Sequence, residues 1–483
     1  MVMSYFDSSD DREEYINSFY RTHEFDEEHI LVTTETGSWA VLDSEEYDLL
    51  RQGKAEEKPE LYEKLKELGV ILTEDNVEKI SRMYAKRKGQ LFHPPSLHII
   101  TPTMRCNAQC LYCHSRAIPS AEGEYNMDRE TAKETVDFIL STPMDSLVIE
   151  FQGGDCLLNF ETTEFIIDYA RKRAEQLDKD VDFRLVTNMT MMNEEILESL
   201  KERNIRGIST SLDGPKEVHN KNRPYVGGGG TYEDAIHWID RINEEFSEDF
   251  SINALSTITR YNFGHGEELV EEYMDHGMHG VWLRPLNNIG FAEEKWEEIG
   301  YTMDEFFDFW KDTLDYILDK NREEDVVFKE LMTMIFLRKI LTQKDPQMVD
   351  IMSPCGAGIG QLLYKHNGDI HTCDEGKIYD EFRLGNVKED SFQEVMDSDS
   401  IRTMVDVSSK ESYICDNCEW KPYCGVCPIY TYAQQGSVVS KVTMDDRANL
   451  YRKVIKEIFR RIIYSEEDRK VFRKWLEDER RVV

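Results

Sequence analysis

The sequence is poor in positive charge. Its 58 Lys and Arg residues stand against 95 Asp and Glu residues, which gives a formal net charge of −37. A surface of this sign repels phosphate backbones, so we expect no nucleic-acid partner. The sequence also lacks any apolar run near the roughly 20 residues of a membrane helix, and its acidic N-terminus lacks the basic and apolar regions of a signal peptide. We therefore expect a cytoplasmic protein without a membrane partner.

The chain has no internal repeat and no long low-complexity tract. Its 483 residues, of which 40% are hydrophobic, suffice for two or three domains with one full α/β core. Ten cysteines are present, and a reducing cytoplasm argues against disulfides between them. All but one fall into two groups far apart in the sequence, which favours metal or iron–sulfur ligation. The exception, Cys156, is predicted to be a small buried apolar residue.

Residues 1–92 are predicted to form a small α+β unit. Two apolar segments flank Glu35-Thr36-Gly37 as in a β-hairpin, and two helices follow. The expected elements are strands at 30–34 and 38–42, helices at 44–51 and 59–68, a short apolar segment at 70–72 and a helical linker over 76–92.

Residues 93–300 are predicted to alternate between strands and helices. The expected strands are 97–101, 146–151, 182–187, 206–211, 251–258 and 280–285, with helices near 128–141, 161–177, 193–203, 231–247 and 265–277. Such units form a parallel sheet, either doubly wound or part of a barrel. Motifs at the carboxyl ends of its strands then face one site.

The remainder of the chain is predicted to form three further units. These are a helical connector over 301–350, a small cysteine-rich domain over 351–446 and a charged C-terminal helix over 447–483.

The first cysteine group, Cys106, Cys110 and Cys113, follows the first strand of the predicted sheet. Three thiolates at this spacing can wrap one iron–sulfur cube and leave its fourth iron without a protein ligand. An open iron can bind a substrate or cofactor. Zinc or plain buried thiols are the alternative, but zinc needs a fourth ligand, and His114 is awkward because it directly follows Cys113.

This C-x3-C-x2-C motif in a strand-to-helix loop resembles the radical S-adenosylmethionine (SAM) enzymes. The resemblance covers about residues 97–290 and implies an α/β fold with a partial (β/α)6 TIM-like barrel. It also implies that a [4Fe–4S] cluster cleaves SAM reductively, so that a 5′-deoxyadenosyl radical abstracts a substrate hydrogen.

The same resemblance implies a group of residues that hold the amino group of SAM. Gln152-Gly153-Gly154-Asp155 closes the second strand and is similar to the family's Gly-Gly-Glu motif, with Asp in place of Glu. Its backbone and carboxylate are expected to bind the methionine amino group. Taken alone, Gly-Gly-Asp is an ordinary turn.

Further SAM contacts are implied at the next two strand ends. Asn188 is placed like the family's ribose-binding residue, and Ser211 and Arg223 are placed to bind the SAM carboxylate. Asp213 belongs to the same string, SLDGP-x3-HN-x2-R, which resembles peptide- and protein-modifying members. The alternatives are a helix cap at Asn188 and a structural ion pair between Asp213 and Arg223.

The second cysteine group resembles the SPASM extension, which carries auxiliary iron–sulfur clusters in peptide-modifying radical SAM enzymes. The resemblance implies one cluster on Cys355, Cys373 and Cys427, and another on Cys415, Cys418, Cys424 and Asp446, with Asp445 the next choice. An aspartate is needed because no cysteine follows Cys427, and the first of these clusters keeps an open iron. A single auxiliary [4Fe–4S] cluster and a zinc knuckle are the alternatives.

Asp374 directly follows Cys373, at a position where sulfatase-maturing relatives have their proposed general base. The resemblance therefore implies that Asp374 is catalytic, if it lies within hydrogen-bond reach of a substrate. Glu375 is adjacent, and a solvated acidic turn is the alternative interpretation.

The most similar family is the radical SAM maturase of the His-Xaa-Ser peptide system. The supporting strings are IEFQGGDCLLNF (149–160), STSLDGPKEVHNKNRP (209–224), LRPLNNIGFA (283–292), CGAGIGQLLYKHNGDIHTCDEG (355–376), FRLGNV (382–387) and PYCGVCPIYTYAQQG (422–436). The implied function is radical modification of a ribosomally made peptide, as a crosslink or thioether. Implied partners are the precursor peptide, a flavodoxin or ferredoxin as electron donor, and a second maturase.

The N-terminal unit vaguely resembles a leader-recognition module that binds a precursor by adding a strand to a sheet edge. The alternative is a docking subdomain for the barrel. Two other functions stay open for the whole chain: a maturase that oxidises Cys or Ser to formylglycine, and a non-catalytic partner that binds peptide or relays electrons.

Overall fold

The computed structural model describes residues 15–119, 125–324, 326–342, 344–410 and 413–478. The ends of two predicted units, 1–14 and 479–483, lie outside these residues. Within the part of the chain that is described, no helix is both long and apolar enough to span a membrane.

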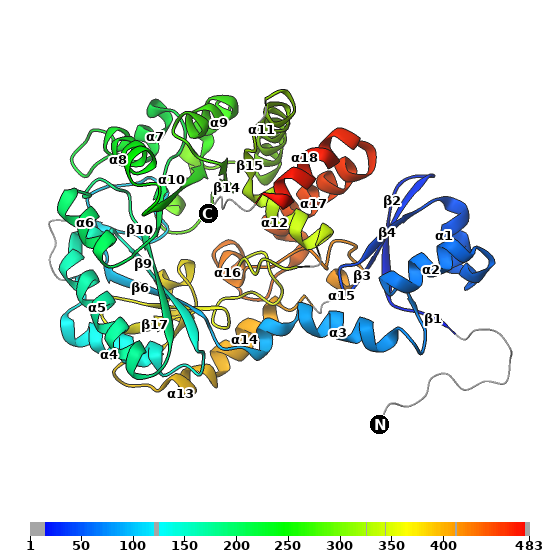
Figure 1. The fold of residues 1–483 in the computed structure, drawn as a ribbon, viewed down its shortest axis with the longest axis horizontal. Coiled ribbons are helices and arrows are strands. Elements are labelled where there is room, and N and C mark those ends of the chain that lie inside the picture. Colours follow the sequence, from blue (N-terminus) through cyan, green and yellow to red (C-terminus); the bar gives the residue numbers. More distant parts are fainter. Residues whose placement is uncertain (1–14, 120–124, 325, 343, 411–412, 479–483) are drawn as a thin grey trace.

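A nine-stranded sheet organises the larger part of the molecule (Figure 1). Six of its strands are parallel and follow one another in chain order: β6 (Leu97–Thr103), β9 (Ser146–Gly153), β10 (Asp180–Val186), β11 (Gly207–Ser211), β12 (Ser251–Ile258) and β14 (Leu283–Pro285). Because the order never reverses, the sheet is part of a barrel rather than doubly wound. The predicted α/β fold is confirmed, and so are its strands except 280–285, which is split into β13 (Gly280–Val281) and β14. The strand β13 pairs with β15 (Lys329–Glu330) in a separate sheet.

Helices follow the strands and cover the outside of this sheet (Figure 1). They are α4 (Arg129–Leu140), α5 (Phe160–Gln176), α6 (Glu194–Glu202), α7 (Lys216–Asn222), α8 (Tyr232–Glu245) and α9 (Gly266–Asp275). Their apolar faces and the strands form one continuous core, in which Cys156 is fully buried as predicted.

The sheet continues into the cysteine-rich region. The strand β16 (Gln361–Tyr364) pairs in parallel with β6, with Gln361 opposite Leu97. Two antiparallel strands, β17 (Asp369–His371) and β18 (Arg383–Asn386), extend the sheet further. The cysteine-rich region was predicted as a separate small domain, but part of it is the edge of the barrel sheet.

Helices complete the connector and the C-terminal part. They are α10 (Phe291–Ile299), α11 (Met303–Glu323), α12 (Leu331–Leu341), α13 (Phe392–Met396), α14 (Asp399–Ser408), α15 (Tyr413–Asp416), α16 (Pro428–Gln435), α17 (Asp446–Tyr464) and α18 (Glu466–Glu477). The single predicted C-terminal helix is two helices, because Ser465 caps α18 by accepting a 3.1 Å hydrogen bond from the backbone N–H of Asp468.

The N-terminal unit has its own small core and lies at the opposite end of the molecule from the barrel (Figure 1). Its elements are β1 (Ile16–Asn17), β2 (Tyr20–Asp26), β3 (His29–Thr34), β4 (Trp39–Leu42), α1 (Ser44–Arg51), α2 (Pro59–Leu68) and β5 (Ile71–Leu72), and α3 (Val77–Arg87) leads away from it. The strand β2 was not predicted, because its sequence YRTHEFD is mostly polar.

The N-terminal unit docks on the cysteine-rich region. The Nδ1 atom of His23 lies 2.9 Å from a Glu419 carboxylate oxygen, and the Thr33 hydroxyl donates a 2.9 Å hydrogen bond to the Glu419 carbonyl. The Tyr423 hydroxyl donates to the Gly37 carbonyl at 3.1 Å. The unit therefore packs against the cysteine-rich region, and its role as a docking subdomain or a leader-recognition module stays a prediction.

Candidate active site

The two glycines of the Gly-Gly-Asp motif allow close packing against the first cysteine loop. A Cβ at Gly154 would lie 2.1 Å from the Arg105 carbonyl oxygen, and Gly153 has a φ of +128°. The backbone N–H of Gly154 donates to the Thr103 carbonyl at 3.0 Å, and that of Asp155 donates to the Arg105 carbonyl at 2.8 Å. Side chains at either position would push the segment that leads to Cys106 away from β9.

Asp155 has a different set of contacts from the predicted ones. Its carboxylate is 1% exposed and accepts hydrogen bonds from the Thr187 hydroxyl and from the backbone N–H groups of Asn188 and Leu157, at 2.8 to 3.0 Å. The carboxylate therefore ties the ends of two strands together. Its role at the SAM amino group stays a prediction.

The three thiols of the first group share one neighbourhood. Burial raises the pKa of Cys106, and the nearby Cys110 and Cys113 raise it further. Burial also raises the pKa of Cys110 to about 11, although the guanidinium of Arg223 opposes the rise. The Asn188 amide nitrogen lies 3.6 Å from the Cys106 sulfur, so this predicted residue reaches the same place.

Asp213 and Arg223 form the ion pair that was the alternative to a SAM contact. The Nε of Arg223 lies 3.0 Å from a carboxylate oxygen of Asp213, which is fully buried. The Tyr112 hydroxyl donates to the same oxygen at 2.5 Å, and an Arg223 nitrogen lies 3.7 Å from the Cys110 sulfur. The pair positions the cysteine loop, and Ser211 ends the neighbouring strand β11.

A histidine and an aspartate join the barrel to the cysteine-rich region. The Nε2 of His114 lies 2.6 Å from a carboxylate oxygen of Asp374, which also bonds to the Lys377 amine. Although burial works in the opposite direction, Lys377 and His114 hold the pKa of Asp374 well below its usual range. Sequence reasoning treated His114 only as an awkward zinc ligand. Its position directly after Cys113 was the one signal that it belongs to the site.

The cysteines of the second group separate into two triads. The first triad is Cys355, Cys373 and Cys427, which pack together in one buried cluster. The second triad is Cys415, Cys418 and Cys424, which line one small cavity of about 20 Å³. This is the division that the resemblance implied, although ligation itself stays a proposal.

The second triad does not include Asp446. Asp446 is exposed and its carboxylate accepts a 2.8 Å hydrogen bond from the Gln434 amide. Ala448 and Arg452, one turn apart on α17, line the cavity instead, and a residue two positions before Ala448 points to the other side of the helix. Asp445 is buried, but its carboxylate already accepts hydrogen bonds from the Thr431 and Ser440 hydroxyls and from the backbone N–H of Ala448. Neither aspartate is placed as the predicted fourth ligand.

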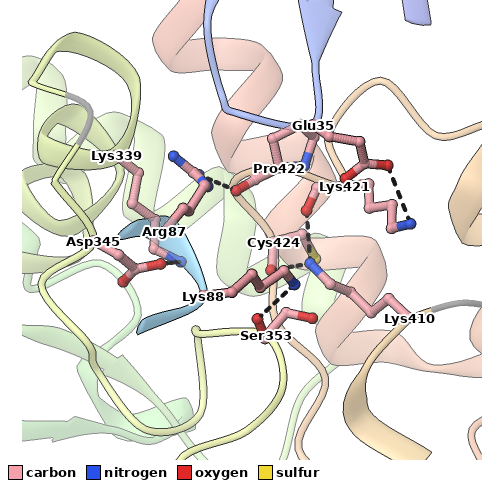
Figure 2. A pocket seen from close by; sticks show the side chains of 10 residues that line it. All are labelled: Glu35, Arg87, Lys88, Lys339, Asp345, Ser353, Lys410, Lys421, Pro422 and Cys424. Carbon is pink, nitrogen blue, oxygen red and sulfur yellow. Dashed lines mark hydrogen bonds and ion pairs between the residues drawn. The ribbon is translucent and has the colours of Figure 1, made fainter. Parts of the chain in front are cut away.

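The charged residues that line the cavity of the second triad itself are Lys410, Lys421 and Arg452. Figure 2 shows Lys410 beside Cys424, and in the adjoining cavity the carboxylates of Glu35 and Asp345 pair with Lys421 and Lys339. The Lys410 amine donates hydrogen bonds to the carbonyls of Cys424 and Lys421, the latter at 2.6 Å. Burial lowers the pKa of Lys410 to about 8, and Cys424 opposes this shift.

The donor sets fit iron–sulfur clusters. Each of the three sites offers three thiols, mostly buried, on loops beside polar groups that contact sulfur. Among the described residues, no three His, Cys, Asp or Glu side chains converge on one point as ligands of a single ion. A cluster does not require such convergence, because each thiolate binds a separate iron.

Family models match two segments of the chain. Residues 100–276 match the radical SAM superfamily, and residues 355–419 match the SPASM iron–sulfur cluster-binding domain. The first segment contains Cys106, Cys110 and Cys113. The second contains Cys355, Cys373, Cys415 and Cys418, and it ends before Cys424 and Cys427.

Two curated relatives illustrate the range of similarity. An uncharacterized protein of Methanocaldococcus jannaschii is 30% identical over 183 residues, which cover 38% of this chain and 60% of the relative. A cysteine-type anaerobic sulfatase-maturating enzyme of Clostridium perfringens is 25% identical over 348 residues, which cover 68% of this chain and 88% of that enzyme.

Solved structures share the fold. Native anSMEcpe with bound AdoMet and Kp18Cys peptide superposes with a TM-score of 0.65 at 21% identity, covering 77% of this chain and 98% of that one. SuiB of Streptococcus suis bound to the precursor peptide SuiA superposes with a TM-score of 0.52 at 12% identity, covering 88% of this chain and 98% of that one. The cofactors of the matched domains are SAM and [4Fe–4S] clusters. The chain therefore contains a radical SAM domain, followed by a SPASM-type iron–sulfur cluster-binding domain.

Proposed function

We propose that the chain is a maturase that modifies a ribosomally made peptide by radical chemistry. The observation that carries this proposal is the 2.6 Å contact between His114 and Asp374. This contact joins an imidazole and a carboxylate between the first cysteine loop and the extension. It supports an acid–base role in a reaction in which a substrate side chain loses both a hydrogen atom and a proton. When bound, the cluster and SAM supply the 5′-deoxyadenosyl radical that takes the hydrogen atom.

His114 and Asp374 divide the proton chemistry between them. Asp374 is engaged by both His114 and Lys377, and its lowered pKa makes it a weak proton acceptor. By accepting the Nε2–H of His114 it fixes the ring so that Nδ1 is the acceptor atom. We assign the base to His114 and the orienting role to Asp374, which refines the role predicted for Asp374 alone.

A peptide partner is supported by the N-terminal unit. Within the described residues, β2 pairs only with β3, so one edge of the three-stranded sheet is open to an added strand. The solved structures of SuiB and anSMEcpe each hold a peptide, as their descriptions state. A low-potential donor such as a flavodoxin or ferredoxin, a second maturase, and the His-Xaa-Ser system itself stay predictions.

The first experiment measures 5′-deoxyadenosine. The protein is purified without oxygen, reconstituted with iron and sulfide, reduced, and mixed with SAM. Formation of 5′-deoxyadenosine is expected to require Cys106, Cys110 and Cys113, and a variant with all three changed to Ala is the control. Absence of 5′-deoxyadenosine from an iron-replete protein would instead favour the electron-relay partner.

A second candidate function is oxidation of Cys or Ser in a protein to formylglycine. The similarity to the sulfatase-maturating enzyme over 68% of the chain favours it, as does an aspartate directly after Cys373. The two functions are separated by products. A cysteine-containing sulfatase peptide turned into an aldehyde, trapped with a hydrazide, supports the second. A crosslink or thioether in a peptide encoded beside the gene supports the first.

A further inference from the structure

Glu375 is not the solvated turn residue that the sequence suggested. Its side chain is 13% exposed and lies between the barrel and the first triad. One carboxylate oxygen, Oε2, lies 3.9 Å from the Cys427 sulfur. An unpaired buried carboxylate is costly, and Arg284 pairs with the other oxygen of this one.

The other carboxylate oxygen of Glu375 is fixed from the barrel side. Oε1 accepts a 3.0 Å hydrogen bond from the Arg284 guanidinium and a 2.6 Å hydrogen bond from the Asn287 amide. Arg447 in turn donates to the Asn287 side-chain oxygen. Both donors therefore bind the same oxygen, and Oε2 is left directed at the thiols. Outer partners that orient a ligand in this way are typical of metal sites.

All three thiols of the first triad lie in the field of this carboxylate. The Cys427 thiol donates to Oε2 of Glu375 at 3.9 Å, and Cys355 and Cys373 lie in the same buried cluster as Cys427. The neighbouring carboxylate, Asp374, is occupied by His114 and Lys377. Of the two adjacent acids, Glu375 is the one with a carboxylate oxygen in contact with sulfur.

We propose that Oε2 of Glu375 is the fourth protein ligand of the cluster held by Cys355, Cys373 and Cys427. The proposal rests on the proposed function in so far as that function includes an auxiliary cluster at this triad. A cube has four irons, the triad supplies three thiolates, and carboxylate oxygen is an established iron ligand. With Glu375 bound, this cluster has no open iron, so it carries electrons or supports the fold and does not bind the substrate directly.

The test isolates this cluster spectroscopically. In a Cys106→Ala/Cys418→Ala background, the other two sites each lose a ligand, and the remaining iron belongs to the first triad. The electron paramagnetic resonance (EPR) spectrum of the reduced cluster is recorded with and without cyanide, which binds an open iron. With Glu375 present, cyanide is expected to leave the spectrum unchanged. In Glu375→Ala it is expected to shift the spectrum, and Glu375→Gln is expected to shift it without cyanide.

Glu381→Gln is the matched control. Glu381 lies in the same region, and its carboxylate accepts a 2.6 Å hydrogen bond from the exposed Tyr432 hydroxyl. If the background variant does not fold, the same spectra are recorded from Glu375→Gln and from the wild type, and one is subtracted from the other. A cyanide response in the presence of Glu375, or identical spectra with and without Glu375, would overturn the ligand assignment alone. No iron in the background variant, or iron that survives Cys373→Ala, would overturn the auxiliary cluster as well.

Discussion

The two cysteine triads of the extension differ in the charged groups nearest to their sulfur atoms. Cys355, Cys373 and Cys427 face the barrel, with the carboxylate of Glu375 3.9 Å from the Cys427 sulfur. Cys415, Cys418 and Cys424 face the N-terminal unit, and the charged residues that line their cavity are Lys410, Lys421 and Arg452. Negative groups near a cluster favour its oxidised form, and positive groups favour its reduced form. The comparison therefore assigns the more easily reduced cluster to the second triad, at the end far from the barrel.

The largest expected effect comes from removing one thiol of either triad. Both Cys373→Ala and Cys418→Ala are expected to lose a cluster, which is about four iron atoms per chain. Only Cys418→Ala is expected to loosen the N-terminal unit, because that unit docks through Glu419. Hydrogen exchange of β2 and β3 measures the loosening. Equal exchange in the two variants would remove the difference that we infer between the triads.

The next largest effect is expected at the contact between His114 and Asp374, which lies beside the first triad. His114→Ala is expected to reduce peptide modification by roughly 10²–10⁴-fold, which is the usual contribution of a general base. Asp374→Asn is expected to have a smaller effect, because it leaves the ring of His114 in place. Formation of 5′-deoxyadenosine is expected to continue in both variants, uncoupled from product. The exposed His265, 3.7 Å from Glu268, is the control residue, and unchanged product in His114→Ala would contradict the assignment.

Sequence reasoning predicted the local features of the molecule and missed contacts between residues far apart in the chain. The strands of the barrel were predicted because local alternation of apolar residues reports on them directly. The division of the cysteines followed from a motif. The pairing of β16 with β6 was missed, because residues 361 and 97 meet only in the fold. The contact of His114 with Asp374 and the hydrogen bond between Thr187 and Asp155 also join residues far apart in the chain. The position of Asp446 depends on which side of α17 it occupies.

A finer test changes the charge around the second triad. Lys410→Met is expected to lower the reduction potential of that cluster, because it removes a positive charge close to the cluster. The negative charge of the bound cluster favours the protonated, positive form of Lys410. It also leaves the Cys424 and Lys421 carbonyls without a buried donor, at a cost of about 1–3 kcal/mol. An EPR redox titration measures the potential, with the exposed Lys388→Met as the control. If Lys410→Met shifted only the potential of the cluster at the first triad, the inferred difference between the two triads would be wrong.

The smallest effect is expected at the contact between the N-terminal unit and the second triad. Although burial works against it, Arg21 and Lys421 lower the pKa of Glu35. A lowered folded-state pKa means that the carboxylate stabilises docking above its ordinary pKa, and that this stabilisation is lost as pH falls through the lowered value. Glu35→Gln is therefore expected to weaken docking by about 1 kcal/mol at neutral pH and to match the wild type in acid. Hydrogen exchange of β3 across this pH range measures the difference, with the exposed Glu67→Gln as the control. A difference that persists in acid would show that Glu35 acts through its shape rather than its charge.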